Sequence, residues 1–218
     1  MTRLLGFYRT SIGKKIVMAG TGIALLGFVI GHLLGNLQVY LGPEKLNAYA
    51  EFLHENIGVL WLARIGLLVA VVLHVDAAVR LTRQKHRSRK VAYTKTGYEG
   101  SDYASRTMMW SGPIILLFVI YHLAHFTWGT AHHDFQGMDV YHNVVSGFSV
   151  FWVSALYIAA MIALGFHLYH GIWSFFQTLG LNHPRWNALR RCLATLLTVG
   201  IVAGNISIPL AVLTGFIK

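Results

Sequence analysis

The chain has few charged residues for its length. Of its 218 residues only 12% are Asp, Glu, Lys or Arg, about half the share in an average soluble domain. Apolar residues make up 55%, and the mean hydropathy is +0.54, which excludes a disordered chain and argues against a soluble fold. Among the charged residues, 8 are acidic and 18 are basic, so the net charge is +10. This charge favours nucleic-acid binding only if the basic residues share an accessible surface, and their positions decide that question.

Cysteine is almost absent as well. Cys192 is alone, which excludes an intrachain disulfide, a zinc ribbon and an iron–sulfur cluster held by four thiolates. The first apolar run is too long for the core of a signal peptide and lacks a small-residue cleavage site near its end. No long repeat or linker divides the chain, so we expect a single membrane domain over residues 1–218.

Five long apolar runs predict an all-α membrane protein. A bilayer core of about 30 Å is crossed by about 20 apolar helical residues, and five stretches reach this length. We expect spanning helices at residues 16–40, 58–82, 107–131, 147–178 and 190–216. The predicted fold is therefore an integral membrane bundle of five helices.

The basic residues gather on one side of this bundle. Fifteen of the eighteen precede the first span, or lie in the connections between the second and third and the fourth and fifth spans, including the adjoining span ends. Connections rich in Lys and Arg face the cytoplasm, so we expect a cytoplasmic N-terminus and an outside C-terminus, and no nucleic-acid partner. The longest of these connections, from Arg80 to Arg106, either binds anionic lipid headgroups or docks a soluble partner.

Histidines within the spans carry the chemical signal. Ionisable residues at membrane depth are costly and are functional candidates by default. A single one can simply bond a backbone carbonyl, but the first four spans each hold at least one and the fifth holds none. The helical rise of about 1.5 Å per residue sorts them by depth into an outer and an inner level. The outer level holds His32 with His122, and the inner level holds His74 with His167 or His170.

Paired histidines at two levels predict two stacked haem b groups. Two imidazoles that face each other from different helices can supply both axial ligands of a haem iron, which favours electron transfer. Zinc or copper usually adds carboxylate or thiolate ligands. A proton relay would instead alternate Asp, Glu and His along one path.

Glycines and cations near the histidines fit a large, flat, anionic ligand. Gly31 and Gly35 flank His32, and Gly171 follows His167 by one helical turn. These glycines either leave room for a macrocycle or allow close helix packing.

Haem propionates need basic partners near the ends of the spans. Arg64 stands at the outer end of the second span, while Arg80 and Arg83 stand at its inner end. We expect these three side chains to contact propionates, with snorkelling to lipid headgroups as the alternative for Arg64.

Four short motifs follow one another at the expected depths: GHLLGN at 31–36, LHVDAAVRL at 73–81, YHLAHF at 121–126 and FHLYHGIWSF at 166–175. With them, the whole chain resembles the cytochrome b membrane-anchor subunit of succinate:quinone oxidoreductase, the respiratory complex II. The resemblance is to the single-chain, five-helix, two-haem form, which also occurs in quinol:fumarate reductases.

The resemblance implies axial ligands and partners. It implies His32 and His122 for the outer haem, and His74 and His167 for the inner haem. His125 and His170 then pack nearby or contact propionates. A flavoprotein subunit and an iron–sulfur subunit on the cytoplasmic face of a bacterial inner membrane would deliver electrons, and menaquinone rather than ubiquinone would receive them.

The quinone site is less defined. The candidates lie after the first span, toward the outer haem: Glu51, His54 and Glu55. The alternative is a solvated amphipathic helix at the membrane interface. A further polar cluster is expected to be an ordinary outer loop rather than a metal site, and comprises His132, His133, Asp134 and His142.

Other functions stay open at this stage. The haem b subunit of a formate dehydrogenase or hydrogenase also carries histidine pairs in a small bundle. A transporter or proton channel, and a structural membrane protein with hydrogen-bonded histidines, would bind no haem. The direction of electron flow, toward succinate oxidation or fumarate reduction, also stays open.

Overall fold

The structure is a computed structural model that describes residues 2–88 and 103–218. It is 86% helical, and the described residues contain no strand. In chain order the elements are α1 (Thr2–Arg9), α2 (Ser11–Asn36), the 3₁₀ helix η1 (Leu37–Leu41), α3 (Pro43–Glu55), α4 (Ile57–Arg87), α5 (Tyr103–Phe126), α6 (Val140–Ser149), α7 (Phe151–Thr178), the 3₁₀ helix η2 (Pro184–Trp186) and α8 (Asn187–Leu213).

Five helical segments of the described chain are long and apolar enough to cross a membrane. They are α2 with η1, α4, α5, α7, and η2 with α8. The five-span prediction is therefore confirmed, and the fold is consistent with a multi-pass membrane protein. The membrane itself and the direction of the termini stay predictions.

The helix boundaries differ from the predicted ones at specific residues. The predicted helix at 147–178 is divided at Val150, whose φ of −80° and ψ of 110° are extended, so α6 ends before α7 begins. The third span ends at Phe126, five residues early, and Gly129 then takes a φ of +70°. This left-handed conformation favours glycine. Apolar composition predicted the spans but did not register these two breaks.

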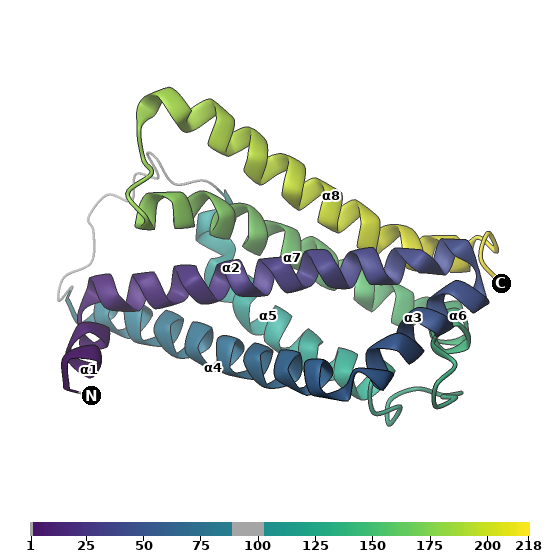
Figure 1. Ribbon diagram of the computed structural model, residues 1–218. Helices are drawn as coiled ribbons and strands as arrows, with labels where there is room; N and C mark the ends of the chain where they lie inside the picture. Colours follow the sequence, from purple (N-terminus) through teal and green to yellow (C-terminus); the bar gives the residue numbers. More distant parts are fainter. Residues whose placement is uncertain (1, 89–102) are drawn as a thin grey trace.

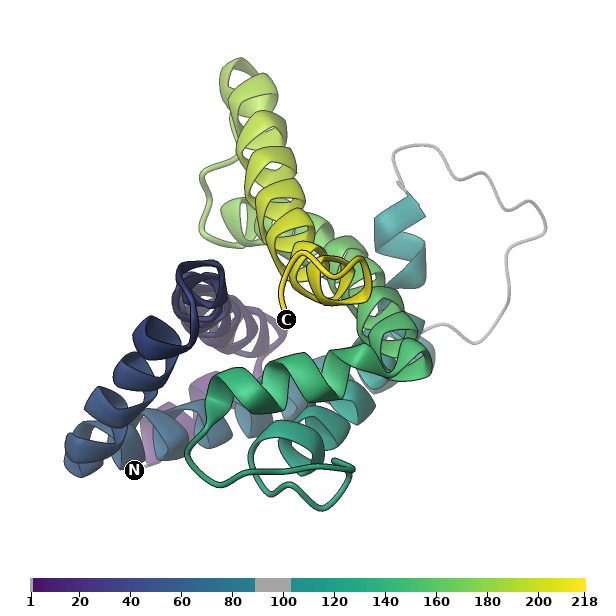
Figure 2. The ribbon, with the colours of Figure 1, turned by 90° about the vertical axis from the view of Figure 1, so that its right-hand side faces the viewer.

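The spanning helices form two groups. In one group α2 packs along α4, and in the other α7 packs against both α5 and α8. The groups meet where α2 touches α7 and α8 (Figures 1 and 2). Neither α2 with α5 nor α4 with α7 makes extensive backbone contact. Any link between these helices is therefore made by side chains.

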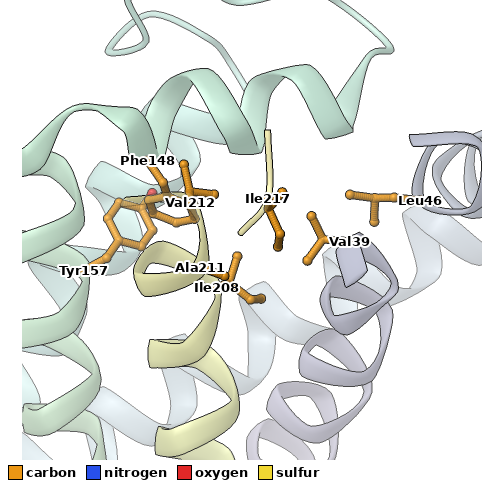
Figure 3. Close-up of a cluster of buried hydrophobic side chains, with 8 residues drawn as sticks. All are labelled: Val39, Leu46, Phe148, Tyr157, Ile208, Ala211, Val212 and Ile217. Atoms are coloured by element: carbon orange, nitrogen blue, oxygen red, sulfur yellow. The ribbon is translucent and has the colours of Figure 1, made fainter. Parts of the chain in front are cut away.

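The two ends of the bundle are built differently. One end carries α1, the end of α4 and η2, and is called the basic end here; the other carries α3, α6 and the C-terminus, and is called the C-terminal end (Figure 1). The C-terminal end holds a buried apolar cluster from η1, α3, α6, α7, α8 and the chain terminus (Figure 3). Its members are Val39, Leu46, Phe148, Tyr157, Ile208, Ala211, Val212 and Ile217.

Polar caps fasten α3 to α6 at this end. The Asp139 carboxylate accepts hydrogen bonds from the backbone N–H of His142 and the side-chain amide of Asn47, each at 2.9 Å. The Asn47 amide oxygen in turn accepts from the backbone N–H of Tyr141 at 2.9 Å. These hydrogen bonds to the carboxylate hold the pKa of Asp139 below its ordinary value of 3.8. Asp139 therefore caps α6 in its ionised form.

Replacing Asp139 with alanine should lower the free energy of unfolding by about 1 kcal/mol, because α6 loses its N-cap. The depressed pKa means that this contribution is complete above pH 3.8 and is lost as the pH falls through the folded-state value. Thermal unfolding of the detergent-solubilised chain, wild type against D139A, measures both effects. A stability difference between the two proteins that stays constant into strong acid would contradict this role.

Candidate functional site

The outer pair joins the two helix groups. His32 on α2 and His122 on α5 have ring centroids 5.7 Å apart, with their planes at 86°. Phe28 stacks on His32 from the preceding turn of α2, at 5.3 Å. The Nδ1 of His122 lies 3.3 Å from the hydroxyl of Tyr157 on α7. The structure thus brings together the two histidines that depth alone had paired.

The inner pair joins the same two groups at another level. His74 on α4 and His167 on α7 have ring centroids 6.2 Å apart. The Nδ1 of His74 lies 3.1 Å from the Thr21 hydroxyl on α2. The Nδ1 of His167 lies 3.4 Å from the Ser111 hydroxyl on α5. Each histidine therefore touches a hydroxyl on a helix other than its own.

These hydroxyl contacts decide which ring nitrogen is available. In His74, His122 and His167 the Nδ1 is engaged, and Nε2 lies on the far side of the ring. A histidine that binds a metal through one nitrogen almost always donates its other N–H to a second group, which fixes the tautomer and the ring orientation. Three of the four paired histidines have this arrangement.

The spacing along two helices gives the distance between the levels. On α2, Thr21 contacts the inner pair and His32 belongs to the outer pair. On α5, Ser111 contacts the inner pair and His122 belongs to the outer pair. In both helices the two residues are eleven positions apart. Eleven residues are about three turns, so Thr21 and His32 share one face of α2, and Ser111 and His122 share one face of α5. In both helices the two residues lie about 16 Å apart along the helix axis.

Sequence analysis missed these hydroxyls. Thr21 and Ser111 look like ordinary residues of apolar spans, and nothing local marks them. The available signal was periodicity, because each stands three turns before an outer histidine on the same helix face.

The separation of the ring centres in each pair matches that of two imidazoles that bind one metal ion from opposite sides. Such rings have centres roughly 6 Å apart, because a metal–nitrogen bond is about 2 Å long, and the observed separations are 5.7 and 6.2 Å. Within residues 2–88 and 103–218, no group of three or more His, Cys, Asp or Glu side chains is placed to hold an ion. Each level therefore brings together two histidines and no further side chain of these types.

The paired histidines also keep accessible surface. His32 is exposed, and His74, His122 and His167 are half-buried, although all four lie in spanning helices. In contrast, the side chain of His125 is only 1% exposed. The four paired residues are therefore less enclosed by the described chain than His125 is.

Two of the three predicted glycines border open space. A Cβ atom added to Gly31 or Gly171 would meet nothing within 4 Å. At Gly35 it would lie 2.7 Å from Cε1 of Tyr49, so this glycine allows α3 to approach α2. Gly22, which the sequence did not single out, lies against the His74 ring, where an added Cβ would be 3.5 Å from Cε1.

His125 and His170 lie outside the pairs. The His125 ring stacks between Tyr121 at 5.5 Å and His132 at 4.7 Å, and its Nδ1 lies 3.1 Å from the Tyr157 hydroxyl. His170 contacts Ser174 on its own helix, with Nε2 at 3.0 Å from the hydroxyl oxygen. The structure therefore places His122 beside His32 and His167 beside His74.

The three cations predicted to contact propionates have other surroundings in the structure, and their role stays a prediction. Arg64 is exposed and lies over the Trp61 ring of its own helix, 5.3 Å from the ring centroid. Arg80 pairs with Asp76 through hydrogen bonds of 2.6 and 2.8 Å. Arg83 follows His74 by nine residues, or about two and a half turns, and therefore projects from the opposite face of α4.

Arg190 is the buried cation that sequence analysis did not select. Its side chain on α8 is 3% exposed and lies over Trp173 of α7, 4.5 Å from the ring centroid. Its Nη2 donates to the side chains of Asn182 and Asn187. Its Nε and Nη1 are buried and have no hydrogen-bond acceptor in the described part of the chain. An unpaired buried cation is costly, so this position suits an anionic group.

The predicted quinone-site residues lie on an exposed surface. Glu51, His54 and Glu55 are all exposed on α3, and His54 donates through Nδ1 to the carbonyl of Ala50 at 2.8 Å. Leu46 and Ala50 are the buried residues of α3. His54 follows Ala50 by one turn on the same side, and Glu51 and Glu55 lie farther around the helix. This arrangement is that of an amphipathic helix.

The polar loop between α5 and α6 is held by its own hydrogen bonds. The Nε2 of His142 lies 2.8 Å from the Asp134 carboxylate. His132 accepts the backbone N–H of Asp134 at 3.1 Å through Nδ1 and donates through Nε2 to the carbonyl of Asn143 at 2.9 Å. Both ring nitrogens of His132 are therefore used within the loop.

Comparisons with protein-family models, curated proteins and solved structures found no match for this chain. The fold and the site by themselves define an all-helical, five-span protein with two levels of paired histidines.

Proposed function

We propose that the chain is the dihaem cytochrome b membrane anchor of a succinate:quinone oxidoreductase. The observation that carries the proposal is the pairing of His32 with His122 and of His74 with His167. Both pairs bridge helices that otherwise make little backbone contact. They lie about 16 Å apart along the bundle, a spacing suited to electron transfer from one bound group to the next.

Each pair would hold one haem b through its Nε2 atoms. A haem iron with two histidine ligands carries single electrons and is closed to oxygen. The hydroxyls of Thr21, Ser111 and Tyr157 would accept the Nδ1–H groups and orient the rings. Gly31 and Gly171 leave open space beside the outer and inner pairs.

Arg190 is a further candidate partner for an inner propionate. It lies over Trp173, which follows His167 by six residues, about 9 Å along α7. Its unpaired Nε and Nη1 would then gain an anionic acceptor. Arg80 and Arg83 remain the other candidates for that role.

The remaining centres of the reaction would belong to partners. The chain has one cysteine and no flavin motif, so a flavoprotein subunit and an iron–sulfur subunit would supply electrons from succinate. The basic end would face the cytoplasm of a bacterial cell and hold them. Residues 89–102 of the connection expected to dock them lie outside the described residues.

The quinone would react near the outer pair, at the C-terminal end. Menaquinone is the expected acceptor, and the exposed Glu51, His54 and Glu55 remain its candidate proton-exchanging groups on α3. Electrons would then cross from the inner pair to the outer pair before they reach the quinone. Reversed flow would give a quinol:fumarate reductase.

Electron donors added to membranes that contain the complete complex test this function. Succinate should reduce the haem b of wild-type membranes, and a menaquinone analogue should then re-oxidise it. Malonate, a competitive analogue of succinate, should block the reduction and is the control for the dicarboxylate site.

Other donors separate the alternatives. Haem that is reduced by formate or hydrogen but not by succinate would contradict the proposal and identify the subunit of another respiratory enzyme. Purified protein without any haem band would favour a transporter or a structural membrane protein.

A further inference from the structure

An open pocket of about 520 Å³ lies at the basic end, between α1, α2 and α4. It is separate from both histidine pairs, because its α4 residues lie on the face of that helix opposite His74. Its charged lining residues are five cations and one carboxylate, namely Arg9, Lys14, Arg80, Arg83, Arg87 and Asp76. The pocket is therefore strongly positive.

Hydrogen bonds between the three helices set the shape of this pocket. The Tyr8 hydroxyl on α1 donates to the Asp76 carboxylate on α4 at 2.5 Å. Lys14 on α2 donates to the Gln84 side-chain oxygen on α4 at 3.1 Å. Gln84 donates in turn to the Ser11 hydroxyl at 2.6 Å. The pocket is thus a built feature of the fold.

Its positive charge is largely uncompensated. The only carboxylate in the lining, Asp76, pairs with Arg80. No carboxylate forms an ion pair with Arg9, Arg83 or Arg87 within residues 2–88 and 103–218. An oxyanion with more than one negative charge would therefore be favoured here.

An apolar stripe leads from the pocket along the same face of α4. Val79 lines the pocket and is preceded on α4 by Val72, Val69 and Ile65. Successive members of this series are seven, three and four residues apart, so all four side chains lie on one helix face. All four side chains are exposed. A free anion would use only the cations, whereas a phospholipid would cover both the cations and this stripe.

We propose that the pocket binds the phosphate of an anionic phospholipid whose acyl chains lie along the apolar stripe of α4. The excess of cations favours a lipid with two phosphates over a lipid with one. Membrane-proximal Lys and Arg residues attract anionic headgroups, and here the fold gathers them around one cavity. The site does not depend on haem binding.

The test uses the full-length chain, purified in detergent and examined by native mass spectrometry with added lipid. Diphosphatidylglycerol should remain bound more strongly than phosphatidylglycerol, and phosphatidylcholine least. In the variant R83Q/R87Q the affinity for diphosphatidylglycerol should fall about tenfold or more. The charge-matched control is K85Q/R185Q, which removes two exposed cations that do not line the pocket; it should retain nearly wild-type lipid binding.

Four results would overturn the proposal. Equal losses in the two double variants would mean a general effect of surface charge. Equal binding of the three lipids would remove the role of phosphate charge. Displacement of the lipid by inorganic phosphate alone would mean that the apolar stripe contributes nothing. Unchanged lipid binding with loss of haem in R83Q/R87Q would assign these arginines to a propionate instead.

Discussion

Replacing His32 with alanine should remove one haem and leave the other in place, and replacing His122 should remove the same one. The two rings are 5.7 Å apart and come from different helices, so under the proposed function each would supply one ligand of the same iron. Losing one of two protein ligands leaves a haem without its second anchor, and no third His, Cys, Asp or Glu in the described residues is grouped with this pair to replace it.

The inner pair should behave in the same way and independently. Alanine at His74 or at His167 should remove the second haem and retain the first, because the two levels are about 16 Å apart. The measurement is the haem-to-protein ratio of each purified variant, together with the absorption band of the haem that remains. Each single variant should fall from two haems to one.

The neighbouring histidines provide matched controls. His125 and His170 lie on the same two helices, three residues after His122 and His167. The ring contacts across the two levels are those of His32 with His122 and of His74 with His167. We therefore expect H170A to keep both haems, and H125A to keep both with the outer one bound less firmly. If H125A lost the outer haem completely and H122A retained it, His125 rather than His122 would be the ligand.

Replacing Tyr157 with phenylalanine should weaken the outer haem selectively, by about 10–100-fold in affinity, as is typical when a group behind a metal ligand is removed. The Tyr157 hydroxyl lies between the Nδ1 atoms of His122 and His125, at 3.3 and 3.1 Å. A hydroxyl donates one hydrogen bond and accepts others. If His122 binds iron through Nε2, its Nδ1–H donates to the hydroxyl, which then donates to Nδ1 of His125.

This order of hydrogen bonds explains why His122 can be a ligand and His125 cannot. His125 then carries its proton on Nε2 and is not a ligand in that tautomer. In Y157F the proton on Nδ1 of His122 loses its acceptor, and the ring loses the contact that orients it. His125 loses its donor in the same variant.

Tyr121 offers a close control for this prediction. Its ring contacts both Tyr157 and His125, but no hydrogen bond joins its hydroxyl to His122. Haem transfer to an excess of a haem-scavenging protein should be faster for the outer haem in Y157F and unchanged in Y121F. T21V should produce the corresponding effect on the inner haem alone. Equal behaviour of Y157F and Y121F would mean that the hydroxyl does not orient the ligand.

The number and the approximate positions of the spanning helices were predictable, because hydrophobicity determines them. Five apolar runs gave five spanning helices, since only a helix satisfies its backbone within a bilayer. The helix break at Val150 was not predictable in this way, because it lies within an uncharged run and depends on backbone dihedral angles.

The two levels and the outer pair followed from depth, which sequence position and helical rise determine, whereas depth left His167 and His170 open as the partner of His74. The hydroxyls behind them did not, because Thr21 and Ser111 become relevant only when four helices are in place. The assignment of Arg83 used depth but not direction, and nine residues turn it to the opposite face of α4 from His74. The burial of Arg190 arises from packing over Trp173 on another helix, which its position near a span end does not indicate.

The haem content of the purified wild-type chain tests the central claim most directly. Pyridine haemochrome analysis against protein concentration, with a reduced-minus-oxidised spectrum of the same sample, should give two haem b groups per chain, both six-coordinate. A chain saturated at one haem, or a chain that binds none when haem is supplied, would contradict the assignment of two histidine pairs as two haem sites.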